Sequence, residues 1–269
     1  ERLTYTASTG EGGGNVTACV SRLATGLARR LVPGDQRPLL AIPSPDGSHV
    51  AINVVDGSSS TIWVQDSAGA RPRQLTTEGF EAFTTMSWSP DGRSILYVSR
   101  RTGTTDLWVV SVEGGAPRQL TRDVRNDGGG VWSPDGKWVA FISDRGRESA
   151  IWLVSANGGV EQRVTRTPGR ESRLAWKPGT NELTFVRNLL TGGIWAVDVA
   201  TRAERRLTPD SVKTNGFYGS PDGTQIIYII NRGAGVQDLA VMPVTGGAPR
   251  SLVSGGGTVT RSQWSPNGK

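Results

Sequence analysis

Few residues in this chain have the chemistry and spacing that catalysis requires. The 269 residues include one histidine, His49, and one cysteine, Cys19. A Ser-His-Asp arrangement would have to use His49, which follows a turn at the start of a strand, where we expect a solvated or packed side chain. The sequence has no Gly-x-Ser-x-Gly motif, the turn that presents the nucleophile of many hydrolases. We therefore predict that the chain holds no catalytic residues and is not an enzyme.

Metal and cofactor sites are not predicted either. One cysteine can form neither an internal disulfide nor a cysteine-based metal site, and neither a phosphate-binding loop nor a zinc-ligand spacing is present. Four aspartates recur at one repeat position and could suggest a ring of calcium ligands, but turns explain them, and the alternating oxygen ligands of an EF-hand are absent. We predict no metal and no cofactor. The four aspartates are Asp46, Asp91, Asp135 and Asp222.

The chain is basic, with a formal net charge of +6 that comes mainly from arginine. Nucleic-acid-binding proteins cluster Lys and Arg on one face or helix, whereas these arginines recur once or twice in each repeat. Many lie in the last strand of a repeat, where charge discourages edge-to-edge pairing of sheets. We predict no nucleic-acid partner. No apolar run approaches the roughly 20 residues of a membrane span. The last-strand arginines are Arg29, Arg73, Arg118, Arg163, Arg205, Arg206 and Arg250.

A four-residue turn, Ser-Pro-Asp-Gly, organises the sequence. Its copies begin 43 to 45 residues apart, a period typical of repeat architectures built from one supersecondary unit. Proline presets φ at the second position, aspartate bonds nearby backbone amides and glycine takes a positive φ. The copies begin at Ser44, Ser89, Ser133, Lys177, Ser220 and Ser265, and the fourth, Lys177-Pro178-Gly179-Thr180, has lost both serine and aspartate.

Each repeat is predicted to form four short strands. In the second complete repeat these strands cover residues 84–89, 94–99, 106–112 and 117–121. Short strands bounded by Gly and Pro at regular spacing indicate an all-β fold, and the length of the period favours the four-stranded blades of a β-propeller. Tryptophans mark the same register, and we expect them to pack between blades. They are Trp88, Trp132, Trp176 and Trp264 before the turn, and Trp63, Trp108, Trp152 and Trp195 in the third strand.

Six repeats predict a single domain, a six-bladed β-propeller over residues 1–269. The C-terminal strand 261–265 would join the N-terminal strands 3–8, 16–20 and 29–32, so that a blade shared between the N- and C-termini closes the ring. Closure would leave neither terminal strand as a bare edge. The predicted blades cover residues 38–76, 83–121, 128–165, 172–208 and 215–253, and the shared blade combines 258–269 with 1–32.

The blades resemble those of TolB-type propellers. The resemblance rests on the Trp-Ser-Pro-Asp-Gly turns, on Asp-Leu-Trp or Ile-Trp in the third strand, and on a terminal Gln-Leu-Thr such as Gln74 to Thr76. It covers the whole chain and implies a periplasmic or other extracytoplasmic localisation. Similar blades occur in periplasmic TolB, in propellers that gate prolyl oligopeptidase-family and tricorn-like peptidases, and in sensor halves of bacterial receptor kinases. A fold alone does not fix which of these roles applies.

Two classes of function fit these observations. The first is a non-catalytic protein–protein interaction propeller, a TolB-like scaffold or accessory subunit that docks on a membrane or envelope complex, or a receptor kinase's sensor ectodomain. The second is the substrate-gating propeller of a larger prolyl oligopeptidase-like peptidase. The uniform blades and the lack of a recognisable group of catalytic residues favour the first class. A propeller lyase or glycosidase is disfavoured, because neither histidines nor paired carboxylates recur on the inner strands.

The loops that join the fourth strand of one blade to the first strand of the next provide the predicted binding site. In a propeller these loops surround one mouth of the channel, and five of the six contain or adjoin a basic residue. Like charges around a concave mouth attract an anionic partner, and the sixth loop adds two phenylalanines as apolar anchors. We predict that a protein partner binds here through an acidic segment, contacting Arg37, Phe80, Phe83, Arg125, Arg170, Arg173, Lys213 and Arg261.

Overall fold

In the computed structural model the described residues form antiparallel sheets and no helix. Only the strand backbone is described for residues 2–8, 16–22, 28–30, 37 and 56. Side chains are described for residues 38–55, 59–66, 72–77, 85–146, 148–167, 169–188, 192–214, 216–255, 258–259, 262, 264–265 and 268. The chain divides into two compact units, residues 1–132 and 133–269.

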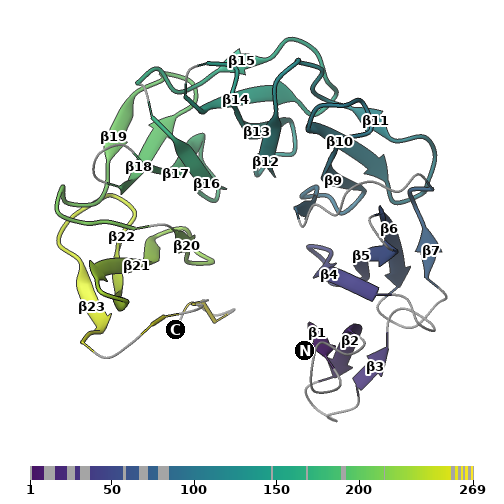
Figure 1. The fold of residues 1–269 in the computed structure, drawn as a ribbon, viewed down its shortest axis with the longest axis horizontal. Helices are drawn as coiled ribbons and strands as arrows, with labels where there is room; N and C mark the ends of the chain where they lie inside the picture. The colour runs from purple at the N-terminus through teal and green to yellow at the C-terminus, as the bar shows by residue number, and fades with distance from the viewer. Residues whose placement is uncertain are drawn as a thin grey trace. The chain divides into compact units, whose positions relative to one another are not determined.

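Five sheets have four strands each, and their strands follow one another in chain order (Figure 1). This confirms the all-β fold and the four-stranded blade. The three-stranded sheet contains β1 (Arg2–Ser8), β2 (Val16–Arg22) and β3 (Ala28–Arg30). Two further sheets of residues 1–132 contain β4 (Arg37–Pro43), β5 (His49–Asp56), β6 (Ser59–Asp66) and β7 (Arg73–Gln74), and β8 (Met86–Trp88), β9 (Ser94–Ser99), β10 (Asp106–Ser111) and β11 (Arg118–Gln119).

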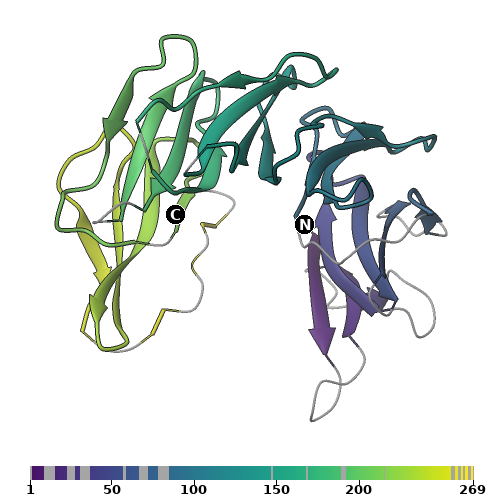
Figure 2. The ribbon, with the colours of Figure 1, turned by 45° about the horizontal axis from the view of Figure 1, so that its top comes forward.

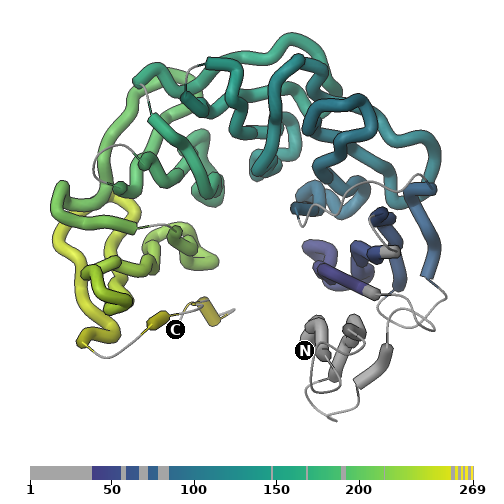
Figure 3. Tube along the Cα trace, in the orientation of Figure 1, coloured from purple at the N-terminus to yellow at the C-terminus, as the bar shows by residue number. Residues whose placement is uncertain are grey.

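The remaining sheets repeat this plan, and the tube in Figure 3 shows the same meander in each of them. One sheet contains β12 (Asp127–Trp132), β13 (Trp138–Ser143), β14 (Ala150–Ser155) and β15 (Gln162–Arg163). The next contains β16 (Glu171–Trp176), β17 (Glu182–Arg187), β18 (Gly193–Asp198) and β19 (Glu204–Arg206). The last contains β20 (Phe217–Gly219), β21 (Gln225–Gly233), β22 (Val236–Pro243) and β23 (Arg250–Val253).

A serine–aspartate pair fixes each intact turn. The Ser44 hydroxyl donates to Oδ1 of Asp46 at 2.6 Å and accepts from the backbone N–H of His49 at 2.9 Å, while Gly47 N–H donates to the Ser44 carbonyl. Gly47 has φ 69°, the left-handed conformation that glycine adopts without strain. The same serine-to-aspartate bond recurs at Ser89, Ser133 and Ser220.

In four of the five four-stranded sheets the outer strand has only two or three residues, because a Leu-Thr or Val-Thr pair follows it and replaces its last ladder bonds. Leu75 N–H donates to the Ile62 carbonyl at 2.8 Å, and the Thr76 hydroxyl accepts from Ile62 N–H at 2.9 Å. In the second complete repeat the outer strand is thus only Arg118–Gln119, rather than residues 117–121. The equivalent threonines, Thr121, Thr165 and Thr208, accept from Leu107, Ile151 and Ile194.

Neighbouring sheets pack face to face within each unit (Figure 2). Trp88 and Trp108 lie in the cluster that joins the sheets β4–β7 and β8–β11, as expected of blade-packing tryptophans. The Trp88 indole also donates to the Ile42 carbonyl of the preceding sheet at 3.0 Å. Between the sheets β16–β19 and β20–β23 the cluster includes Val186, Ile194, Ala196, Phe217, Tyr228, Ala240 and Met242.

Candidate protein interaction surface

Four of the eight residues predicted to bind a partner are described, and all four are exposed. Arg125 lies between β11 and β12 in residues 1–132. The other three, Arg170, Arg173 and Lys213, lie in residues 133–269, in or next to the segments that join β15 to β16 and β19 to β20. Of Arg37 only the strand backbone is described, and Phe80, Phe83 and Arg261 lie outside the described residues.

Arg173 lies against the segment that joins β19 to β20. A Cβ atom on Gly216 would lie 3.9 Å from Nε of Arg173. The Lys213 carbonyl accepts a hydrogen bond from Asn231 N–H at 2.9 Å, which fixes this segment to the end of β21. The fold therefore places Arg173 beside the segment that carries Lys213, although the two residues are far apart in the sequence.

The backbone around Arg173 is unusual for a strand. Arg173 has φ 55°, a left-handed conformation that is uncommon for residues other than glycine. It lies where the pairing of β16 with β17 shifts register between Ser172 and Ala175, and such bulges re-aim a side chain. At the equivalent position of β12, three residues before Trp132, the chain has Gly129 with φ 62°. Arginine thus occupies a position that glycine fills in the preceding repeat.

A buried ion cluster lies where the loop between β15 and β16 enters β16, next to Arg170 and Arg173 in the chain. The guanidinium of Arg187, at the end of β17, donates from Nη2 to Glu171 at 2.7 Å and from Nη1 to Glu204 at 2.7 Å. The side chains of Arg187 and Glu171 are 1% and 0% exposed, so this Glu171–Arg187–Glu204 cluster is shielded from water. Oε1 of Glu204 accepts from the backbone N–H of Arg166 at 2.7 Å, which ties the loop to the cluster.

The surroundings of the cluster stabilise its charges. The Arg187 guanidinium lies 4.8 Å from the ring centre of Trp195, within cation–π range. Burial opposes its charge, but hydrogen bonds to Glu171 and Glu204 raise the pKa of Arg187 above its ordinary value. Burial raises the pKa of Glu171, with Arg187 opposing it. Burial also acts on Glu204, but Arg166 N–H and Arg187 hold its pKa below the ordinary value.

The sequence analysis missed this cluster, although a repeated signal was present. An arginine near the end of the second strand stacks on the third-strand tryptophan in three repeats, as Arg101 does on Trp108 at 4.2 Å. Where the fifth complete repeat has Ala240 in place of that tryptophan, Arg232 instead pairs with Asp238 at 2.7 Å. The other two pairs are Arg145 with Trp152 and Arg187 with Trp195.

His49 does touch a serine, but the order of contacts is not that of a hydrolase triad. The Ser48 hydroxyl lies 2.7 Å from Nδ1 of His49 and donates to Oδ2 of Asp46 at 2.7 Å. The serine thus lies between the carboxylate and the histidine, whereas in a triad the histidine lies between the serine and the carboxylate. His49 is half-buried at the start of β5, next to the first turn.

Neither a metal-ligand group nor a membrane-spanning helix is found among the described residues. Among the residues with described side chains, no group of three or more His, Cys, Asp or Glu residues is arranged to hold a metal ion. The part of the chain that the structure describes contains no helix of the length and hydrophobicity needed to cross a membrane.

Comparison with known proteins decides the family. The model of the TolB beta propeller domain family matches residues 43–268. The chain belongs to this family. The match covers all six turn motifs, so the resemblance expected from the repeated turns and the Gln-Leu-Thr segments is confirmed for this TolB-family propeller.

Solved structures with this fold have diverse names. TolB from Acinetobacter baumannii aligns with 96% of this chain at 20% identity and a TM-score of 0.64, and 64% of that TolB is covered. An oligogalacturonate lyase in complex with manganese aligns with 94% of this chain at 17% identity and a TM-score of 0.75, and 74% of it is covered. At these identities the likeness shows the fold alone.

A prolyl endopeptidase gives a similar result. It aligns with 95% of the chain at 14% identity and a TM-score of 0.75, but only 42% of the endopeptidase is covered. The TolB-family propeller thus spans less than two thirds of the Acinetobacter TolB and less than half of the endopeptidase. A search of curated proteins gave no match.

Proposed function

We propose that this chain is a non-catalytic binding module whose loops between blades hold an acidic segment of a partner protein. Support comes from residues 133–269, where Arg170, Arg173 and Lys213 are all exposed, and Arg173 lies beside the segment that carries Lys213. Exposed cations on neighbouring loops raise the local concentration of an anionic partner and speed its association. Arg37, Arg125 and Arg261, with Phe80 and Phe83, would extend this site on the other loops of the propeller.

The strongest support for this proposal is the left-handed backbone conformation of Arg173. A left-handed residue other than glycine costs roughly 1 to 2 kcal/mol, and the equivalent Gly129 shows that the repeat can avoid this cost. Strained backbone of this kind is concentrated at sites where function requires a particular side chain. An arginine in such a conformation, exposed at the register shift in β16, supports a role in binding rather than in folding.

The Glu171–Arg187–Glu204 cluster supports the same role. A binding side chain acts best when its own backbone is already ordered, because less conformational entropy is then lost on association. Glu204 holds the backbone N–H of Arg166, and the Arg170 carbonyl accepts from Asn188 N–H at 2.9 Å. The loop is therefore anchored on both sides before any partner arrives.

Binding of a fluorescein-labelled octaglutamate peptide provides the test. We expect the affinity, measured by fluorescence anisotropy, to fall at least about tenfold when NaCl rises from about 50 to about 500 mM, because exposed charges are screened at high salt. The triple variant R125E/R170E/R173E should lose binding. The matched variant R118E/R163E/R250E, which changes the net charge equally at exposed outer-strand positions, should retain it.

Replacing Arg173 with glycine separates binding from stability. Arg173→Gly removes a cation and also relieves the left-handed backbone, so the free energy of unfolding should rise by roughly 1 kcal/mol while affinity for octaglutamate falls. A variant that loses stability would show that Arg173 serves the fold. Salt-insensitive peptide binding, or equal effects of the two triple variants, would refute the basic binding surface.

A second candidate function is the substrate-gating propeller of a larger peptidase. The likeness to a prolyl endopeptidase, of which this chain covers 42%, favours it. In that case the catalytic residues would lie in a part of the protein beyond the 269 residues. The sequence of the intact gene separates the two, because only the peptidase reading requires a hydrolase sequence on the same polypeptide.

Membership of the TolB family also favours residence outside the cytoplasm. We infer that the module acts as an extracytoplasmic scaffold or accessory subunit on a membrane or envelope complex. Such docking needs no membrane span in the propeller, since an exposed basic loop surface can hold a protein partner directly.

A further inference from the structure

A second candidate site within residues 133–269 is lined by residues other than Arg170, Arg173 and Lys213. It is a pocket of about 800 Å³ between two neighbouring blades, next to their turns. One wall comes from the turn at Ser133 and from Trp138, at the start of β13. The other comes from the turn that follows Trp176 and from residues 199–202, which join β18 to β19. A volume of 300 to 1,000 Å³ is typical of ligand-binding pockets.

The turn at Lys177 differs from the intact turns in the two positions that follow its proline. Its fourth position, which is glycine in the intact turns, holds Thr180, and its third position, which is aspartate in them, holds Gly179. A Cβ atom on Gly179, whose φ is 67°, would meet no atom within 4 Å. Space is therefore open at this turn, and Pro134 of the preceding turn lines the same pocket.

Three departures from the repeat meet at this pocket. Trp138 is the only tryptophan of the sequence outside the two repeated positions. The turn at Lys177 lacks the serine and aspartate of the intact motif. Between β18 and β19 the usual Gly-Gly is replaced by residues that include Arg202, whose φ is 62°. These changes are not needed to build a blade, and their convergence on one cavity points to a ligand.

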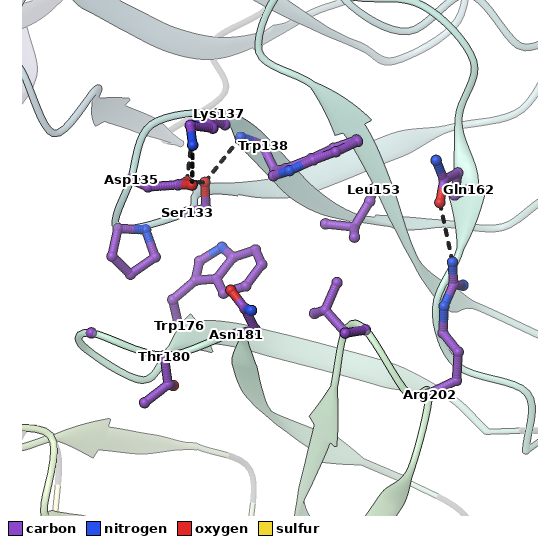
Figure 4. A pocket seen from close by; sticks show the side chains of 14 residues that line it. Ser133, Asp135, Lys137, Trp138, Leu153, Gln162, Trp176, Thr180, Asn181 and Arg202 are labelled. Atoms are coloured by element: carbon purple, nitrogen blue, oxygen red, sulfur yellow. Dashed lines mark hydrogen bonds and ion pairs between the residues drawn. The ribbon is translucent and has the colours of Figure 1, made fainter.

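Three side chains of the pocket lining have hydrogen-bond donors that are free for a ligand. Among the described residues, the indole N–H of Trp138 and the side-chain NH2 groups of Asn181 and Gln162 donate no hydrogen bond, and the side-chain carbonyl of Asn181 accepts none. The side-chain acceptors of Asp135 and Gln162 are engaged. Oδ1 of Asp135 accepts from the Ser133 hydroxyl at 2.6 Å and from Lys137 N–H at 3.1 Å, and Oε1 of Gln162 accepts from Arg202 at 3.2 Å (Figure 4).

We propose that this pocket binds a proline-rich peptide segment in the polyproline II conformation. Such a segment presents carbonyl acceptors but few N–H donors, because proline has no backbone N–H, and it therefore complements a donor-rich pocket. Its pyrrolidine rings pack well on aromatic side chains, which is how aromatic-lined grooves recognise proline-rich ligands. Trp138 and Trp176 supply the aromatic surfaces, with Leu153 beside them (Figure 4).

A saccharide fits the same pocket less well. Sugar hydroxyls both donate and accept, so a sugar site needs free acceptors as well as donors. Asp135, the carboxylate in the pocket lining, is held by its own turn, which leaves the side-chain carbonyl of Asn181 against three free donors. This site lies on different loops from Arg170, Arg173 and Lys213, so the inference does not rest on the proposed acidic partner.

Isothermal titration calorimetry with acetylated, amidated decaproline tests the proposal. We expect one site with a Kd below about 1 mM, and no heat from cellohexaose. Trp138→Gln should weaken binding by at least about tenfold, because a tryptophan that anchors a ligand contributes this much or more. Glutamine occupies the equivalent position at Gln225, directly after the next intact turn, so the strand accommodates it.

Two further variants make the test specific. Asn181→Ala removes a free donor and should weaken decaproline binding with an unchanged unfolding midpoint. Gln225→Ala, at the equivalent position of another blade, should leave the Kd unchanged. Absence of decaproline binding by the folded protein, equal affinity of the Trp138→Gln variant, or binding of cellohexaose in place of decaproline would overturn the proposal.

Discussion

The turn aspartates are the residues whose ionisation the fold changes most consistently. Hydrogen bonds from the hydroxyl of Ser44, and then from the hydroxyl and N–H of Ser48, lower the pKa of Asp46 to about 2. The pKa values of Asp91, Asp135 and Asp222 are also lowered, in each case mainly by the serine two residues before. In each intact turn the carboxylate thus accepts hydrogen bonds from the turn itself. This structural role explains why the aspartates recur.

These shifts predict sensitivity to acid. A carboxyl whose pKa is lower in the folded than in the unfolded state stabilises the fold above its unfolded pKa, and this stabilisation is lost as pH falls through the folded value. For Asp46 the window runs from 3.8 down to about 2. We expect the thermal unfolding midpoint of the native chain to fall in this window, and to fall less in the variant D46N/D91N/D135N/D222N.

Asparagine is a suitable replacement because the sixth turn already contains Asn267. Glu113→Gln, which neutralises an exposed carboxylate outside these turns, serves as the control and should keep the native pH dependence. If the fourfold variant lost stability as steeply as the native chain between pH 4 and 2, the turn aspartates would not be the groups that titrate.

At the scale of the strand, one threonine holds the outer edge in four of the five four-stranded sheets. A backbone N–H of the third strand would be left unsatisfied without the hydroxyl of Thr76 or its equivalents. Since an unpaired buried N–H loses its bond to water as well, the Gln-Leu-Thr signature has a structural cause. It recurs because four of the five four-stranded sheets end in the same way, whereas the sheet of β20 to β23 has Arg250–Val253 at its outer edge and no such threonine.

Replacing Thr76 with valine measures how much its hydrogen bond contributes to the free energy of unfolding. Thr76→Val keeps the shape of the side chain but removes the acceptor for Ile62 N–H, so the free energy of unfolding should fall by roughly 1 to 3 kcal/mol. The neighbouring Thr77 is exposed, and Thr77→Val should change stability by less than about 0.5 kcal/mol. Urea unfolding of both variants provides the measurement, and equal effects would show that the hydroxyl of Thr76 is dispensable.

At the scale of the molecule, the open question is the sixth blade. Contacts in residues 133–269 extend the repeat past β23. The Trp264 indole donates to the Tyr218 carbonyl at 2.9 Å, as Trp88 does to Ile42, and Gly268 approaches Pro221 as Gly92 approaches Pro45. Of residues 261–265, the described ones are not in a strand. The six-bladed ring closed by the two termini therefore stays a prediction.

Hydrogen exchange tests the predicted closure. If residues 258–269 supply a strand to the sheet of β1, β2 and β3, deleting them should expose amides of β1 and speed their exchange by at least about tenfold. Amides of β9 should be unchanged, because β9 pairs with β8 and β10. Unchanged exchange in β1 would rule out the shared blade.

The sequence by itself determined the all-β fold, the four strands of a blade and the family. These follow from local chemistry, because proline, aspartate and glycine define a turn wherever they occur, and a constant period repeats the same unit. Arg125, Arg170, Arg173 and Lys213, which the sequence placed in or beside the loops between blades, are exposed. Their role in binding stays a proposal.

Only the tertiary structure decided what lies between the repeats. Glu171, Arg187 and Glu204 come from three strands, and no spacing in the sequence indicates that they meet. The left-handed conformation of Arg173 depends on a register shift between β16 and β17. The pocket beside Trp138 is lined by residues of two neighbouring blades. Each of these features arises from packing between distant segments, which a local pattern does not encode.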